Sequence, residues 1–144
     1  MKMTKIMAMV AVAPVLLIGS AISAQTIKIG LGTEPTSIDP HYHNLGPNNQ
    51  IAQHFFSRLI EQDHKQRLSP GLAVSWKTLN DTTWEFKLRK GVTFHDGSTF
   101  DAEDVIFSMH RAGNHPNARS SFGLYTKGKA VKKIDNYTLH ISTD

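Results

Sequence analysis

The sequence contains no cysteine. Without thiols the chain forms no disulfide, no thiolate zinc site and no thiol nucleophile, and it has no Cys after the N-terminal segment to carry a lipid. A glycine-rich phosphate loop and a Gly-x-Ser-x-Gly elbow are also missing, which argues against nucleotide hydrolysis and against the α/β-hydrolase type of catalysis. Acidic residues are fewer than basic ones, 12 against 16.

Only one long uncharged run occurs, from Ile6 to Ile22. Lys2 and Lys5 precede it, and small residues follow it, which is the three-part pattern of a secretory signal. A membrane anchor is the alternative, but the apolar stretch is short and Pro14 interrupts it. We therefore predict that residues 1–24 are a cleaved signal peptide, with Ser23–Ala24 as a second cleavage position.

Removal of this segment takes away Lys2 and Lys5 and no acid, so the formal charge falls from +4 to +2. Much of the sequence pI of about 9.4 therefore belongs to the signal, and a nucleic-acid partner is not expected. With no second apolar span, we expect no membrane insertion after cleavage and a periplasmic location, with secretion to the medium as the alternative.

The 144 residues correspond to one domain at most, with 40% apolar and 19% charged residues, as in globular proteins. Apolar periodicity and turn residues predict a mixed α and β chain. The expected elements are a strand at 26–31, a helix at 48–59, a hairpin around Asn80–Asp81 ending in a strand at 82–88, a helix from Asp101 to Gly113, a short helix at 120–127 and a hairpin of 129–134 with 137–142.

The strand at 82–88 alternates apolar and polar residues strictly. Trp84, Phe86 and Leu88 share one face, and this period of two predicts that all three are buried in the core. We accordingly expect Trp84→Ala to cost roughly 3–5 kcal/mol of stability. Gly91 and Asp96–Gly97 are expected to form turns, and Asp101 is expected to cap the following helix.

Three motifs resemble one family. They are the run Gly71–Trp76, the run Asn80–Gly97 with its segment Gly91-Val92-Thr93-Phe94-His95-Asp96-Gly97, and Ala102–Val105. The earlier Gly32–Pro40 resembles the first loop of the same family, with Ile38 where Leu is more usual. The family is the family-5 extracellular solute-binding proteins of ABC importers, of the oligopeptide and dipeptide type, and the resemblance extends over residues 26–144.

The resemblance implies an α/β fold, here the N-terminal part of a two-lobed periplasmic binding protein type II fold. Residues 25–47 would supply the first strand and loop of the large lobe, and residues 48–144 the satellite subdomain. Family members run to several hundred residues, so we expect a truncated form with impaired binding. The implied partners are a peptide or similar small solute and the membrane permease of an ABC importer. The implied activity is not enzymatic, and no cofactor is expected.

The resemblance also suggests ligand contacts. Glu34, Pro35 and Thr36 lie in the loop that borders the cleft in the family, and Glu34 could meet a cationic or amine group, although a solvated carboxylate is an equal alternative. Phe122 and Tyr125 lie in the stretch that reaches the cleft rim and are candidates for contact with a solute, although ordinary packing is the favoured alternative for both. Asp39 is expected to brace its own loop through backbone hydrogen bonds.

Histidine supports the competing hypothesis of an exported metal-binding protein or metal-dependent enzyme. The chain has eight His, and His41-Tyr42-His43 offers two ring nitrogens. No acidic or Cys partner stands nearby at ligand spacing, so we predict no metal site. His95, Asp96 and Ser98 hold the ingredients of a hydrolase triad, but residues so close in sequence cannot easily line up, and we predict no catalytic residue.

Export predicts a defined mature N-terminus. Mass spectrometry of the protein from its native cells should find the chain beginning at Gln25, or one residue earlier, because small residues precede both positions. An intact Met1 in the cytosolic fraction would contradict the prediction of export.

Overall fold

The structure is a computed structural model that describes residues 26–117 and 122–143. The predicted signal peptide, 1–24, lies outside the described residues. The chain divides into two compact units, 1–30 and 31–144, and the account below concerns the second except where residues 26–30 are named. Within the described ranges no helix is long and apolar enough to cross a membrane.

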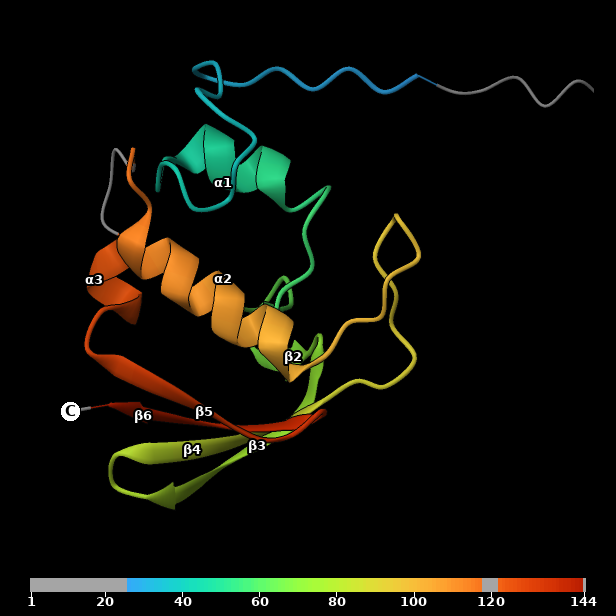
Figure 1. The fold of residues 1–144 in the computed structure, drawn as a ribbon. Helices are drawn as coiled ribbons and strands as arrows, with labels where there is room; N and C mark the ends of the chain where they lie inside the picture. The colour runs from blue at the N-terminus through green and yellow to red at the C-terminus, as the bar shows by residue number, and fades with distance from the viewer. Residues whose placement is uncertain (1–25, 118–121, 144) are drawn as a thin grey trace, which may run out of the picture. The chain divides into compact units, whose positions relative to one another are not determined.

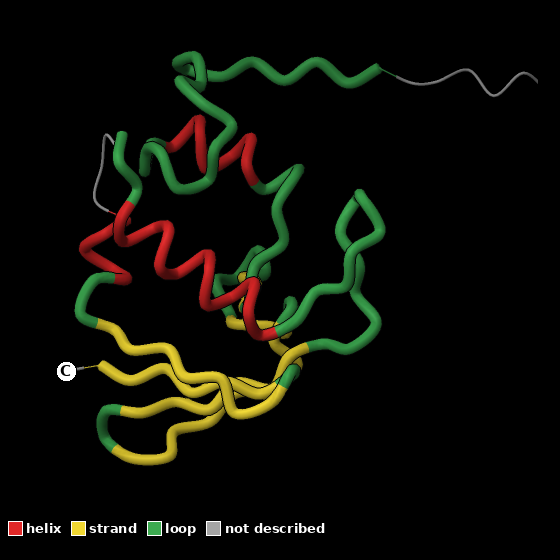
Figure 2. The backbone as a smooth tube through the Cα atoms, in the orientation of Figure 1, coloured by secondary structure: helices red, strands yellow, loops and turns green. Residues whose placement is uncertain are grey.

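A four-stranded antiparallel sheet forms the base of the second unit (Figures 1 and 2). Its strands are β3 (Ala73–Asn80), β4 (Thr83–Leu88), β5 (Lys129–Asp135) and β6 (Thr138–Thr143), in the order β3-β4-β6-β5. The β3–β4 and β5–β6 hairpins were both predicted from their turn residues. Pairing of β4 with β6, which joins the two hairpins, places Phe86 opposite Leu139.

Helix α2 (Ala102–Asn114) lies along one face of this sheet and packs against β5 (Figure 1). Its start is fixed as predicted. The Asp101 carboxylate accepts the Glu103 N–H at 2.7 Å, and the Asp101 N–H donates to the Asp104 carboxylate at 2.8 Å. This reciprocal cap satisfies backbone donors that a helix start leaves free. The short helix α3 (Phe122–Thr126) follows, within the predicted range of 120–127.

The core lies between the sheet and the first turn of α2. Leu139 is fully buried, and Phe86 packs against the cluster from the neighbouring strand. The buried members of this cluster are Ala73, Leu88, Phe100, Ala102, Val105 and Leu139.

Trp84 is not part of this core, so the prediction that the whole apolar face of the strand is buried is wrong. Exposure increases along β4: Leu88 is 3% exposed, Phe86 is half-buried, and Trp84 is 39% exposed. The core gathers where the N-terminal end of α2 meets Leu88, and α2 then runs over β5 rather than β4. Period-two alternation identifies the inward face of a strand but not how far along it the covering helix extends.

The predicted strand at 26–31 is absent. These residues are irregular, with Ile27 83% and Ile29 69% exposed. A strand is stabilised by ladder hydrogen bonds to a neighbour, and no described strand pairs with this segment. The alternation of Ile27 and Ile29 is therefore not sufficient to form a strand here.

The predicted helix at 48–59 is much shorter in the structure, where α1 spans Gly46–Ala52. After Ala52 the chain turns, and it then enters an unpredicted hairpin of β1 (Ile60–Gln62) and β2 (Leu68–Pro70). The Leu59 carbonyl accepts the N–H groups of Gly71 and Ala73, at 3.2 and 2.9 Å. These long-range bonds take Leu59 away from the helix that its spacing predicted.

The predicted turns at Gly91 and Gly97 are confirmed. Their φ angles are 72° and 89°, a region that residues with a Cβ rarely adopt. The Asp96 carboxylate closes the second turn by accepting both the N–H and the hydroxyl of Ser98, at 2.9 and 2.7 Å.

The exposure gradient along the sheet makes a stability prediction. Leu139→Ala should destabilise the protein by about 2–5 kcal/mol, because it opens a cavity in the core. Trp84→Ala should cost less than the roughly 3–5 kcal/mol typical of a buried aromatic, because its ring is already partly in water. Urea denaturation of both variants tests this order, and a larger loss for Trp84→Ala would contradict it.

Candidate functional site

The segment from Thr36 to His43 folds into a tight loop that is held by hydrogen bonds within the loop. The Asp39 N–H donates to Ser37 Oγ at 3.0 Å, and the Asp39 carboxylate accepts the His41 N–H at 2.9 Å. The Tyr42 N–H also donates to the Asp39 carbonyl, at 3.3 Å. The prediction that Asp39 braces its own loop is confirmed.

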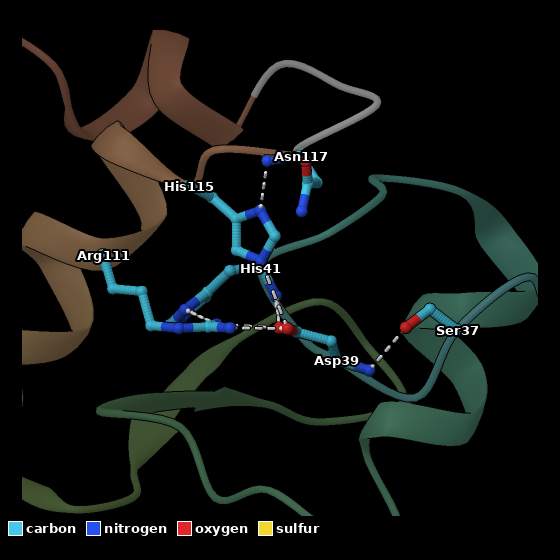
Figure 3. A network of polar contacts seen from close by, with 6 residues as sticks. All are labelled: Ser37, Asp39, His41, Arg111, His115 and Asn117. Atoms are coloured by element: carbon cyan, nitrogen blue, oxygen red, sulfur yellow. Dashed lines mark hydrogen bonds and ion pairs between the residues drawn. The ribbon is translucent and has the colours of Figure 1, made fainter.

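Asp39 also forms an ion pair with Arg111, in the last turn of α2 (Figure 3). Arg111 Nη1 donates to Asp39 Oδ1 at 2.8 Å, and Nη2 donates to Oδ2 at 2.6 Å. Two parallel bonds from a planar guanidinium fix direction as well as distance. The pair thus attaches the loop to α2 across 72 residues of sequence.

Two histidines complete this network (Figure 3). His115 Nε2 lies 3.3 Å from Asp39 Oδ2, and His41 Nδ1 lies 2.9 Å from Arg111 Nη1. The hydrogen bond from Arg111 holds the pKa of Asp39 well below its usual range. Burial, together with the charge of Arg111, lowers the pKa of His41. Asp39 is therefore ionised and His41 neutral at pH 7.

Asn48, in α1, attaches the other end of the loop. Its Oδ1 accepts the Thr36 N–H at 2.9 Å, and its Nδ2 donates to Thr36 Oγ1 at 3.0 Å. Asn48 is 3% exposed, so its amide is buried and satisfied by this one residue. Thr36 Oγ1 also lies 3.1 Å from His43 Nδ1.

An open groove of about 1070 Å³ lies beside the loop. Residues Ser37–His41 line one part of it, together with α1, α2 and α3. Several aromatic side chains line it, and the charged groups Arg58, Asp104 and Arg111 also border it. The aromatic side chains in the lining are Phe56, Phe94, Phe107 and Phe122.

The predicted ligand residues do not all come together. Phe122 lines the groove, whereas Glu34, Pro35, Thr36 and Tyr125 are not among its lining residues. Glu34 is exposed, and none of the ion pairs among the described residues includes it. Tyr125 is 62% exposed on α3.

Arg111 and Asn48 were not identified from the sequence. Arg111 occupies a helix turn that the sequence analysis treated only through its apolar stripe, and Asn48 was only a predicted helix start. A capping or pairing pattern finds partners within a few residues, so it could not pair Asp39 with Arg111.

The histidines do not assemble a metal site in the described ranges. His41 faces Arg111, and His43 faces the Thr36 hydroxyl. No group of three or more His, Asp or Glu side chains that could hold a metal occurs in the part of the chain that the structure describes. Asp96 bonds Ser98 directly, which is a turn contact rather than the linear arrangement of a triad.

The ion pair makes a prediction about stability and pH. Arg111→Met should cost about 1–2 kcal/mol at pH 7, a modest value because both side chains are about one third exposed. Because the folded pKa of Asp39 is lowered, the stabilisation is complete above the unfolded pKa of about 4 and is lost as the pH falls further. The difference between the variant and the wild type should therefore shrink below about pH 4.

Denaturation curves from pH 7 down to pH 3 test this prediction. Arg67→Met is the matched control, since Arg67 pairs with Asp63 on an exposed turn, and it should lose less stability at every pH. Equal losses for the two variants, or a loss at Arg111 that does not depend on pH, would contradict the prediction.

Comparison with known proteins gives consistent matches. Residues 67–144 match the model of the bacterial extracellular solute-binding proteins, family 5 Middle. The periplasmic oligopeptide-binding protein OppA of Escherichia coli K12 is 30% identical over 136 residues, covering 82% of this chain and 25% of OppA. The glutathione-binding protein GsiB of the same strain is 29% identical over 132 residues, covering 91% of this chain and 26% of GsiB.

A solved structure gives the same result. Haemophilus influenzae OppA, in complex with RPPGFSPFR, superposes with a TM-score of 0.69 at 27% identity, covering 78% of this chain and 25% of that one. The predicted α/β fold of a periplasmic binding protein is thereby confirmed. The chain spans about a quarter of the length of these relatives. It belongs to family 5 of the bacterial extracellular solute-binding proteins.

Proposed function

We propose that the chain is part of the solute-binding component of a peptide-type ABC importer, working in the periplasm. The observation that carries this proposal is its likeness in sequence and fold to OppA of Haemophilus influenzae, which was solved with a bound peptide. The E. coli relative is likewise named a periplasmic oligopeptide-binding protein. A cleaved signal at residues 1–24 would deliver the chain to that compartment.

The family is one of binding proteins rather than enzymes, as the sequence analysis expected. Proteins of this kind close two lobes on a solute, and a membrane permease then receives it. For this chain the permease is a proposed partner and a peptide or similar small molecule the proposed solute. The described residues contain no cluster of His, Asp or Glu side chains that would support the metal hypothesis.

Residues 48–144 are proposed as the satellite subdomain, and residues 25–47 as the adjoining part of the large lobe. The sheet, α2 and the core described above supply the scaffold of the former. The chain spans about a quarter of a relative's length, and on this proposal it forms one wall of a cleft. One wall leaves a bound solute in contact with water, so hydrogen bonds and charges are weaker than in a closed site.

The proposed contacts are at two places. The first place is formed by Glu34 and Pro35, which directly precede the braced loop. The exposed carboxylate of Glu34 suits the amino group of a peptide. Phe122 and Tyr125 on α3 offer aromatic surface, which for Tyr125 is already exposed. Thr36 stands next to Pro35, although its own polar groups are occupied by Asn48.

Peptide titration tests the proposal. We expect di- to pentapeptides to shift the NMR signals of residues 33–36 and 122–125 with a dissociation constant of about a millimolar, near 4 kcal/mol of binding. Acetylation of the peptide amino group, or Glu34→Gln, should weaken these shifts. Glu61→Gln is the control, because Glu61 is a half-buried acid of β1 that lies outside both proposed contact places.

Two outcomes would contradict the proposal. If no peptide shifts these signals at tens of millimolar, the proposed contacts are wrong. If calorimetry gives micromolar binding to the chain alone, then one wall is sufficient, and the proposal of impaired binding fails.

A further inference from the structure

We infer that Asn48 and Arg111 are positioning residues, which hold the segment from Thr36 to His41 on α1 and α2 and so set the place from which Glu34 and Pro35 project. The inference rests on the proposed function only for the role of Glu34 as a solute contact. The holding of the segment stands on the contacts themselves. Neither Asn48 nor Arg111 would touch the solute.

Asn48 holds the first end of the segment. Both polar groups of its buried amide are directed at Thr36, one to the backbone N–H and one to the hydroxyl. Two bonds to one residue fix its orientation, as a single bond would not. Thr36 is then an anchor of the loop rather than a solute contact, which revises its expected role.

Arg111 holds the second end. Its planar guanidinium donates to both carboxylate oxygens of Asp39. The ring of His115, the residue directly after α2, also contacts Asp39 Oδ2 (Figure 3). Because α2 is capped at Asp101 and packed on the sheet, Arg111 stands on a rigid element. Through Arg111 and α2, the position of Asp39 is therefore fixed relative to the core of the unit.

Between the two anchors the segment is braced by its own hydrogen bonds. Asp39 is bonded internally to Ser37 and His41, as described above. Proline at positions 35 and 40 fixes φ at each, and a residue that precedes proline is itself restricted, which here is Glu34. The geometry at Thr36 is therefore passed on to the backbone of Glu34 with few free dihedrals between them.

Backbone amide exchange tests the holding of the segment. In Asn48→Leu and in Arg111→Met the amides of Thr36, His41 and Tyr42 should exchange about tenfold faster or more, while those of β4 and β6 keep wild-type protection. Arg111→Lys keeps the charge but not the fork, and it should give an intermediate rate. Gln50→Leu, at an exposed position of α1, and Arg67→Met are the matched controls, and they should leave the segment unchanged.

The same variants, titrated with the tripeptide trialanine, test the consequence for Glu34. The shift of its signals should weaken several-fold in Asn48→Leu and Arg111→Met and stay near wild type in the two controls. If the wild type does not respond to trialanine or longer peptides, the proposed function fails, while the exchange rates still decide whether these residues hold the segment.

The inference is overturned if the segment exchanges as in the wild type in both variants. It is also overturned if Arg111→Lys behaves like Arg111→Met and the Gln50→Leu control loosens the segment equally. Should either variant lose protection in the sheet as well, Thr36→Val and Arg111→Lys replace it. Those milder changes must then accelerate exchange in the segment alone, and unchanged rates there would overturn the inference.

Discussion

The pairing of β4 with β6 is the interaction on which the described unit depends. It joins two hairpins with forty residues between them, and it places the buried Leu139 opposite Phe86, which packs against the core. Side chains alternate between faces along a strand, so a shift of one residue in this register would turn Leu139 toward solvent. Ala102, at the start of α2, is fastened to the same sheet, since its N–H donates to the carbonyl of Asn136 in the β5–β6 turn at 3.0 Å. The sheet register therefore also sets where α2 begins and, one helix length later, where Arg111 stands.

The parts of this fold that the sequence predicts are those with local causes. Asp101 caps α2 through residues two and three positions away, and Gly91 and Gly97 take positive φ values that their own lack of a Cβ permits. The parts that it does not predict have distant causes. The helix expected to reach Leu59 ends at Ala52, and the Leu59 carbonyl instead accepts hydrogen bonds from residues beyond the β1–β2 hairpin. The prediction that Trp84 is buried fails for the same reason, since the exposure of Trp84 depends on the path of α2 and not on the pattern of β4.

The candidate site likewise has features with local causes, which the sequence predicts, and features with distant causes, which it does not. The family resemblance pointed to the loop that contains Glu34 and Thr36, and turn chemistry gave the internal bracing by Asp39. The contacts that place this loop, from Asn48 and Arg111, cross from one element to another and have no signature of spacing. Thr36 shows the consequence. The family resemblance marked Thr36 as a solute contact, and only the structure shows that its hydroxyl accepts a hydrogen bond from Asn48.

Polar contacts, rather than apolar burial, determine how the loop is oriented. Hydrophobic burial is non-directional, and the groove beside the loop keeps Phe56 and Phe107 45% and 66% exposed, so apolar packing there constrains the loop little. An amide with two bonds to Thr36 and a guanidinium fork on Asp39 each admit one geometry. Such bonds are modest in energy but strict in angle. The loop can therefore keep one defined shape while the apolar side chains beside it remain largely exposed.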